Sequence, residues 1–340
     1  MKIHSLAIIA NVQSNGVQGG AEIFHTRLCE SFSRYVDHVE LIPVPCDEST
    51  FESILKAYQT CYDLDLSRFD AVLSSKAPSF AVNHPNHICY LMHTVRVFYD
   101  MFGELSSDPE NFSRRKLLFR MDRELLSPAR LKGLYTIGQE VSDRIRHYIG
   151  VDSIALHPGM TGEGFYCETQ GDYIFLPGRL HRWKRVDLCI KAMQYTKTPV
   201  RLQIAGTGEE DAALHALASG MKNVEFLGRV SDEEMKRLYA NALAVAFTPL
   251  REDYGYILHE AFKSEKPVLT CRDSGEPARF LHHEENGFLC DADPREIAAC
   301  FDRFYLEKDR TAQMGIAGKK SIEDISWQAV VETLLPVFEQ

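Results

Sequence analysis

The sequence predicts an α/β protein made of two doubly wound, Rossmann-like domains. Three observations lead to this fold class. The chain has 340 residues, which is more than one hydrophobic core usually serves. Short β-rich runs alternate with helical stretches along its whole length, which is typical of parallel sheets with crossover helices. The stretch around residues 158–170 is loop-like and separates two such series.

The first series defines an N-terminal domain, residues 1–165. Its helix after the first strand should begin near Gly20. The five apolar runs that we interpret as strands are Ser5–Ala10, His38–Val44, Ala71–Ser74, His87–Met92 and Gly133–Ile137.

The second series defines a C-terminal domain, residues 166–324, and a last helical segment, residues 325–340. The expected strands are Tyr173–Pro177, Val200–Ala205, Val224–Gly228, Leu243–Thr248, Pro267–Thr270 and Gly287–Cys290. The expected helices are Arg185–Gln194, Glu210–Ala218, Asp232–Asn241, Gly255–Lys263 and Pro294–Tyr305. A capping box, Ser231-Asp-Glu-Glu234, supports the start of one of these helices.

Composition and charge exclude several classes of function. The net charge of −10 argues against a nucleic-acid partner, since there is no basic excess to neutralise phosphates. Nine cysteines without a Cys-x-x-Cys pair indicate free thiols in a reducing cytosol. No run reaches the roughly 20 apolar residues of a membrane span. The densest basic stretch, Arg114–Lys132, is interpreted first as a solvated helix face and second as a contact with an anionic membrane.

The candidate site residues follow the strands of the second domain. In doubly wound sheets ligands bind beyond the carboxyl ends of the strands, where helices begin. Arg179 and Lys184 come after the strand that ends at Pro177. An arginine can contact phosphate oxygens with two parallel hydrogen bonds, and a lysine adds a mobile point charge. Together they can stabilise one anionic leaving group.

Two carboxylates, Glu252 and Glu260, lie eight positions apart between an apolar strand and a helix that begins near Gly255. The first amides of that helix lack intrahelical partners and carry the positive end of the helix dipole. This arrangement can hold a diphosphate on backbone donors, while the carboxylates accept hydrogen bonds from sugar hydroxyls. Nucleotide-sugar binding explains this segment best.

Other candidates have competing interpretations. The pair Gly19-Gly20 follows the first strand and precedes a helix, where backbone can approach a phosphate or sugar closely; a flexible loop is the alternative. His93 follows an apolar strand and is either a ligand or a buried, hydrogen-bonded histidine. The turn Gly206-Thr-Gly208 lacks the third glycine of a dinucleotide motif, so we interpret it as structural. We find no metal-binding spacing and expect no metal or cofactor.

Taken together, these residues resemble the retaining glycosyltransferases of the GT-B fold, specifically family 4. The resemblance is strongest over residues 173–291 and is carried by Gly178-Arg-Leu-x3-Lys-Arg185, the Glu-x7-Glu segment ending in Glu260-Ala-Phe, Lys266-Pro-Val, Asp273-Ser-Gly275 and Asn286-Gly-Phe-Leu289. In the first domain it is limited to Gly19-Gly20-Ala-Glu22 and His93-Thr-x-Arg96. One departure is that Glu276 and Arg279 stand where relatives often have glycine and glutamate.

The resemblance implies two domains that face each other across a cleft and a helix at 325–340 that crosses back to the first domain. Arg179 and Lys184 would bind the donor diphosphate and act in catalysis with His93 and Glu252. Glu252 and His93 would contact the transferred sugar, and Glu260 would hold the ribose. The backbone near Tyr256 and Ile257 would meet the phosphates, Val230 would lie near the base, and Gly19 and Gly20 would line the acceptor side.

The expected function is therefore retaining, metal-independent transfer of a hexose from a nucleotide-diphosphate sugar to a saccharide or lipid-linked acceptor, in surface polysaccharide or glycoconjugate synthesis. A UDP-sugar is favoured and GDP-mannose is second, because UDP is common in the family. The alternatives are a nucleotide-sugar epimerase and a non-catalytic two-domain sugar-binding protein. The expected location is the cytoplasm, with peripheral contact at the inner face of the membrane as an option.

Overall fold

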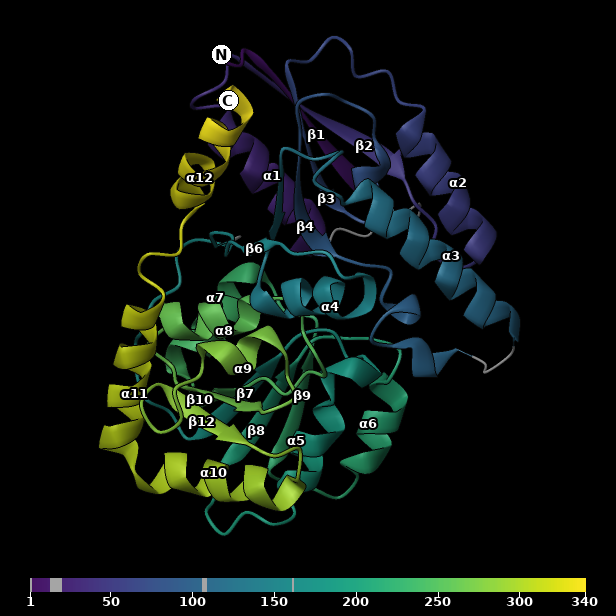
Figure 1. The fold of residues 1–340 in the computed structure, drawn as a ribbon. Coiled ribbons are helices and arrows are strands. Elements are labelled where there is room, and N and C mark those ends of the chain that lie inside the picture. Colours follow the sequence, from purple (N-terminus) through teal and green to yellow (C-terminus); the bar gives the residue numbers. More distant parts are fainter. Residues whose placement is uncertain (1, 13–19, 106–108, 161) are drawn as a thin grey trace. The chain divides into compact units, whose positions relative to one another are not determined.

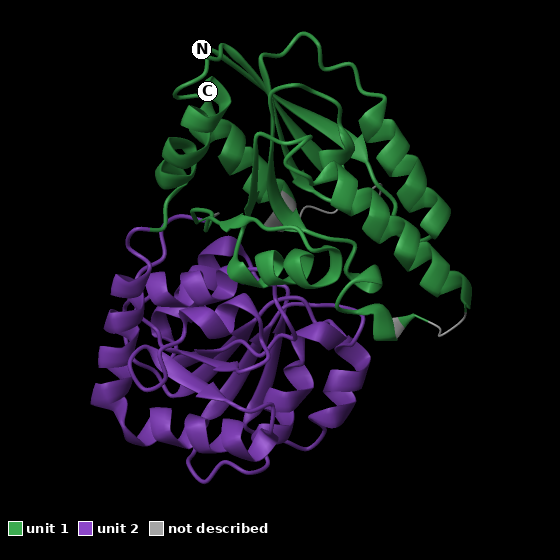
Figure 2. Ribbon diagram, in the orientation of Figure 1, with its two compact units in different colours: residues 1–161, 325–340 green, residues 162–324 purple. Residues whose placement is uncertain are grey.

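The structure is a computed structural model that describes residues 2–12, 20–105, 109–160 and 162–340. Internal contacts divide the chain into two compact units (Figure 2). Unit 1 comprises Met1–Thr161 and Ile325–Gln340, and unit 2 comprises Gly162–Asp324. The sequence analysis had placed this boundary at 165/166.

Unit 1 contains a six-stranded parallel sheet with the strand order β2-β1-β3-β4-β5-β6 (Figure 1). Its strands are β1 Ser5–Val12, β2 His38–Pro45, β3 Ala71–Lys76, β4 His87–His93, β5 Gly133–Thr136 and β6 Ile154–Ala155. Its α-helices are α1 Gly20–Phe32, α2 Phe51–Tyr62, α3 Pro109–Leu125, α4 Gln139–Ile149 and α12 Trp327–Glu339. The five predicted strands are present within a few residues, and the two-residue β6 was not predicted.

The C-terminal helix α12 packs on unit 1 although the whole of unit 2 precedes it in sequence (Figure 2). The rings of Phe24 in α1 and Trp327 in α12 are 5.2 Å apart. The indole Nε1 of Trp327 donates a hydrogen bond to the carbonyl of Met160, and Asn86 donates one to the carbonyl of Phe338. These contacts join the last segment of the chain to the sheet of the first series.

Unit 2 contains a second six-stranded parallel sheet, in the order β12-β11-β10-β7-β8-β9. Its strands are β7 Tyr173–Pro177, β8 Arg201–Ala205, β9 Val224–Gly228, β10 Ala244–Ala246, β11 Val268–Cys271 and β12 Gly287–Cys290. Its α-helices are α5 Val186–Ala192, α6 Asp211–Leu217, α7 Asp232–Asn241, α8 Tyr256–Lys263, α9 Glu276–Phe280, α10 Pro294–Leu306 and α11 Lys308–Ser321. All six predicted strands are present, and α9 and α11 were not predicted.

Fully buried apolar side chains explain why these elements form where they do. Ile174, Leu202 and Ile204 from the strands pack in one cluster with Phe301 and Phe304 of α10. As predicted, Ser231 caps α7 by accepting a hydrogen bond from the amide of Glu234 at 3.2 Å. The fold class predicted from the sequence, two doubly wound parallel sheets, is confirmed.

The order of the strands defines one special position in unit 2. The chain runs from β7 outward through β8 to β9, and then returns to place β10 on the other side of β7. The loops that leave β7 and β10 therefore diverge from neighbouring strand ends. In doubly wound sheets this reversal point is where ligands bind.

Candidate functional site

Four of the predicted site residues lie at this reversal point of unit 2. Arg179 and Lys184 follow β7, and Lys184 ends a short 3₁₀ turn, Arg182–Lys184. Glu252 follows β10, and Glu260 lies in α8. Because β7 and β10 are hydrogen-bonded neighbours, residues far apart in sequence meet at the carboxyl end of the sheet.

Lys184 and Glu252 are in direct contact. The Nζ of Lys184 lies 2.8 Å from Oε1 and 2.7 Å from Oε2 of Glu252, and both side chains are partly buried. The loops that carry them are also joined through the backbone, since the amide of Leu250 donates to the carbonyl of Trp183 at 2.7 Å. The lysine charge is thus held at the carboxyl end of the sheet and balanced by a carboxylate.

The backbone of Glu252 is fixed by the loop that follows β11. The amide of Glu252 donates to the carbonyl of Ser274, and the amide of Glu276 donates to the carbonyl of Glu252, both at 2.9 Å. Between them Gly275 has φ +78°, and a Cβ at this position would lie only 2.5 Å from the Glu252 carbonyl oxygen. Only glycine permits this close approach.

Arg185 joins the same loops and was not identified as a site residue from the sequence. Its guanidinium donates to both carboxylate oxygens of Asp273, at 2.7 and 2.6 Å, and to the backbone carbonyls of Thr248 and Pro249. Arg185, in the loop after β7, therefore connects this loop to the loops after β10 and β11 through hydrogen bonds. The sequence signal was present, because Arg185 and Asp273 both belong to motifs of the family resemblance.

Arg179 has a different partner from Lys184. Its Nε and Nη2 lie 3.2 and 3.3 Å from the carboxylate of Glu209, which also lies 3.3 Å from Nε2 of His181. A hydrogen bond from its own backbone amide, and then the charge of Arg179, lowers the pKa of Glu209. Arg179 is largely exposed, so this pair is open to water and to exchange with another anion.

Glu260 is oriented by an aromatic neighbour. Tyr239 donates from its hydroxyl to Oε2 of Glu260 at 2.6 Å, and the Tyr239 ring is held edge-on by Phe175, 5.0 Å away. Burial raises the pKa of Glu260. The hydroxyl of Tyr256, one turn earlier in α8, is buried and has no hydrogen-bond partner among the described residues.

The amino end of α8 offers backbone donors. Gly255 precedes the helix with φ +88°, and no side chain caps the first turn. Gly178, with φ +127°, lies against this turn, since a Cβ on it would be 3.1 Å from Cδ1 of Ile257. The amides near Tyr256 and Ile257 are therefore available at the edge that carries Lys184, as a diphosphate site requires.

The glycine turn after β8 has a structural role, as the sequence suggested. A Cβ on Gly206 would lie 1.9 Å from the carbonyl oxygen of Gly178, and one on Gly208 would lie 2.2 Å from that of Leu180. The turn packs directly against the loop that presents Arg179. It supports that loop by close contact.

The remaining predicted residues lie elsewhere. Val230 follows β9, the edge strand next to β8. His93 is the last residue of β4 in unit 1 and is half-buried, and its carbonyl accepts a hydrogen bond from the amide of Ala77. Gly20 is the first residue of α1, and Gly19 lies outside the described residues.

No group of three or more His, Cys, Asp or Glu side chains is arranged to hold a metal ion within the part of the chain that the structure describes. In the same residues no helix combines the length and the apolar character required to cross a membrane.

Comparison with known proteins finds a family match in the second half of the chain. Residues 168–321 match the family described as glycosyl transferases group 1. The human alpha-1,3/1,6-mannosyltransferase ALG2 is 33% identical over 112 residues, which are 33% of this chain and 27% of that protein. The chain thus aligns with only about a quarter of this relative's length.

The solved structures match over both units. The Anabaena protein Alr3699/HepE in complex with UDP has a TM-score of 0.71 at 17% identity, and 98% of this chain and 99% of that chain are covered. WaaG, a glycosyltransferase involved in lipopolysaccharide biosynthesis, has a TM-score of 0.72 at 14% identity. The match covers 98% of this chain and 99% of that chain. The fold is the GT-B fold.

Proposed function

We propose that the chain is a retaining glycosyltransferase that moves a hexose from a nucleotide-diphosphate sugar to a saccharide or lipid-linked acceptor. One observation carries this proposal. Lys184, Glu252 and the uncapped amino end of α8 lie together at the reversal point of the unit 2 sheet. The ammonium group and the amides can bind a diphosphate, and the carboxylate can accept hydrogen bonds from a sugar.

The reaction places charge on two groups. As the bond to the anomeric carbon breaks, negative charge grows on the leaving diphosphate and positive charge grows on the sugar. Arg179, Lys184 and the α8 amides would stabilise the diphosphate, and one preorganised donor of this kind contributes ~10²–10³ in turnover. We propose that the leaving phosphate accepts the proton of the acceptor hydroxyl, so that attack occurs on the same face and configuration is retained.

The other residues take their proposed roles from this geometry and from the family resemblance. Glu252 contacts the transferred sugar after Lys184 moves to the diphosphate. Glu260, oriented by Tyr239, accepts hydrogen bonds from the ribose hydroxyls, and Val230 lies near the base. In unit 1, His93 contacts the donor sugar, and Gly19 and Gly20 line the acceptor side.

For the donor we propose a UDP-sugar first and GDP-mannose second, with no metal requirement. The structural match to HepE with UDP supports the first choice, and the identity to a mannosyltransferase supports the second. Because Arg179 and Lys184 can neutralise the leaving group themselves, a divalent cation is not needed. Chelation by EDTA should leave turnover unchanged.

For the acceptor we propose a growing surface polysaccharide or glycoconjugate, with the enzyme in the cytoplasm and in peripheral contact with the inner face of the membrane. The cationic side chains along α3 support the membrane contact. The match to WaaG, whose name refers to lipopolysaccharide biosynthesis, supports an envelope acceptor.

Product analysis tests the proposal against its two rivals. The full chain is incubated with UDP-glucose or GDP-mannose labelled in the hexose, with and without oligosaccharide acceptors. A transferase moves the label to the acceptor, and Glu252→Gln abolishes this transfer. An epimerase leaves the label on the nucleotide as a different sugar, and a binding protein returns the donor unchanged; either outcome would reject the proposal.

A further inference from the structure

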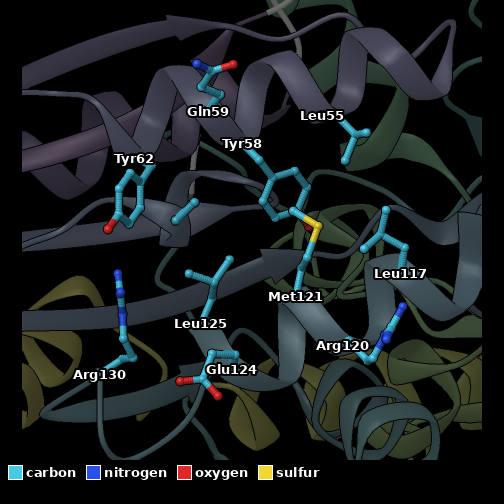
Figure 3. A pocket seen from close by; sticks show the side chains of 11 residues that line it. Leu55, Tyr58, Gln59, Tyr62, Leu117, Arg120, Met121, Glu124, Leu125 and Arg130 are labelled. Atoms are coloured by element: carbon cyan, nitrogen blue, oxygen red, sulfur yellow. The ribbon is translucent and has the colours of Figure 1, made fainter.

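A large apolar groove lies in unit 1. It has a volume of about 730 Å³ and lies between α2 and α3 (Figure 3). Leu55 and Tyr58 line it from α2, and Leu117, Met121 and Leu125 line it from α3. None of the predicted site residues contributes to it. Its size falls within the range of small-molecule sites, about 300–1,000 Å³.

The two ends of the groove carry arginines that differ in their contacts. At one end Arg130 lies 5.9 Å above the ring of Tyr62 and donates to the carbonyl of Val82 at 3.3 Å. At the other end Arg120 is exposed, and it forms no hydrogen bond or ion pair with the described residues. In Figure 3 these two side chains lie on opposite sides of the apolar lining, with Glu124 between them.

The groove and the basic stretch of the sequence belong to the same helix. Residues 114–123 of α3 include five cationic side chains, and Arg120 is the one that borders the apolar lining. A ligand that matches this surface has a hydrocarbon part for the groove and an anionic group for Arg120. Lysine and arginine near a membrane surface attract anionic lipids, and the hydrocarbon chain adds a contribution from every buried methylene.

We propose that this groove binds one hydrocarbon chain of an anionic phospholipid, with the lipid phosphate at Arg120. The Arg130–Tyr62 pair lies at the far end of the groove, so the hydrocarbon chain extends from Arg120 towards this pair. This inference makes the proposed membrane contact a defined lipid site. It does not depend on the transfer reaction, because no donor-site residue takes part in it.

Vesicle binding by the full chain tests the proposal with matched variants. Sedimentation is measured with vesicles of phosphatidylcholine alone and with vesicles that contain an equal part of phosphatidylglycerol. Arg120→Gln and Lys116→Gln remove the same charge from the same helix, but Lys116, which is exposed, does not line the groove. Leu117→Gln changes the lining without changing the charge.

The proposal predicts that Arg120→Gln and Leu117→Gln each weaken binding to the anionic vesicles about tenfold or more, and that Lys116→Gln, which removes only a surface charge, weakens it by no more than about fivefold. Equal losses in Arg120→Gln and Lys116→Gln, with none in Leu117→Gln, would show a diffuse electrostatic contact and reject the site. If Leu117→Gln fails to fold by circular dichroism, Met121→Gln takes its place.

Soluble probes below their micelle concentrations test the chain and the phosphate separately. Dodecyl phosphate should raise the melting temperature, and Leu117→Gln should abolish this shift. Butyl phosphate, which lacks the chain, and dodecyl maltoside, which lacks the anion, should each give much smaller shifts. An equal response to either single-feature probe contradicts the proposal. So does a protein that ignores all the probes and the vesicles but forms a dimer that Leu117→Gln disrupts, since the groove would then hold a second copy.

Discussion

The ammonium group of Lys184 and the carboxylate of Glu252 are in contact although 68 positions separate them in sequence. Each follows one of two adjacent strands, β7 and β10, that leave the sheet at its reversal point. Neither group is deeply buried. The structure therefore places one cation and one carboxylate at the position where doubly wound sheets bind their ligands.

Removing the ammonium group should remove a large part of the activity. We expect Lys184→Ala to lower turnover by ~10²–10³, the usual effect of losing one preorganised donor to a leaving group. Lys191→Ala is the control, because Lys191 forms an exposed i,i+4 ion pair with Asp187 in the next helix. Steady-state kinetics with saturating donor measure the turnover of both variants. A Lys184→Ala protein with more than half of the wild-type turnover would contradict the assigned role.

Gly275 should be required for the position of Glu252 for two reasons. Its φ is positive, and the backbone of Glu252 approaches it too closely for a Cβ. Alanine at a left-handed position costs about 1–2 kcal/mol in strain. Gly220→Ala isolates that cost, since Gly220 has φ +80° and nothing lies within 4 Å of the added Cβ. Gly275 combines φ +78° with ψ −133°, a backbone conformation outside the left-handed helical region, and alanine there adds a clash with the Glu252 backbone.

Urea unfolding and donor binding measured on both glycine variants separate these two effects. We expect Gly220→Ala to lose only the strain energy and to bind donor normally. Gly275→Ala should lose more stability than Gly220→Ala and should bind donor weakly. Normal donor binding by a folded Gly275→Ala protein would show that the loop after β11 does not control Glu252.

Glu209 should compete with the donor for Arg179. An exposed ion pair is worth up to ~1 kcal/mol, so Glu209→Gln should tighten donor binding by about two- to fivefold. Arg179→Ala should weaken it, and adding Glu209→Gln to that variant should bring no further gain. Calorimetric titration at low and high salt measures the dissociation constant of the donor for each variant. The gain in affinity of Glu209→Gln should shrink at high salt because exposed charges are screened. Weaker donor binding by Glu209→Gln would mean that Glu209 holds Arg179 in its active position.

The stability of unit 1 should depend on pH through Asp122. This buried carboxyl accepts hydrogen bonds from Tyr58 and Tyr99, and burial raises its pKa from 3.8 to about 6. A raised carboxyl pKa means that the folded state binds the proton more tightly. Stability is therefore greatest at low pH, and up to ~3 kcal/mol is lost as pH rises from about 4 to above 6.

Asp122→Asn should remove this dependence. The stability of the variant relative to wild type should rise between pH 4 and pH 7, as measured by urea unfolding at intervals of half a pH unit. Asp65→Asn is the control, because hydrogen bonds from Ser67 lower the pKa of Asp65 and leave it ionised over this range. A stability difference between Asp122→Asn and wild type that stays constant across the range would show that Asp122 does not titrate there.

The sequence predicted the strands well because each is a short apolar run that becomes buried. Helix α3 was harder to recognise, since only Asn111, Leu118 and Asp122 of its residues are buried. A helix with so many charged residues resembles a solvated face. The groove beside it depends on the distance between α2 and α3, which no local pattern encodes.

The same distinction applies to the candidate site. Positions after strand ends predicted that Arg179, Lys184 and Glu252 share one edge, because parallel strands point the same way. The partner of each cation could not be predicted. The structure places Glu209 against Arg179, a contact that no spacing in the sequence indicated. Pairing depends on which loops meet across the sheet, and loop conformation is set by long-range contacts such as those of Arg185.

The central claim, that unit 2 binds a nucleoside diphosphate at the β7–β10 edge, is tested most directly by thermal shift with UDP, GDP and ADP and their hexose conjugates in EDTA. A nucleotide at a hundred times its dissociation constant adds ~2.7 kcal/mol to stability. We predict selective stabilisation by one nucleotide, UDP first, that disappears in Arg179→Ala and Glu260→Ala. Stabilisation that survives both substitutions, or no response to any nucleotide, would contradict the claim.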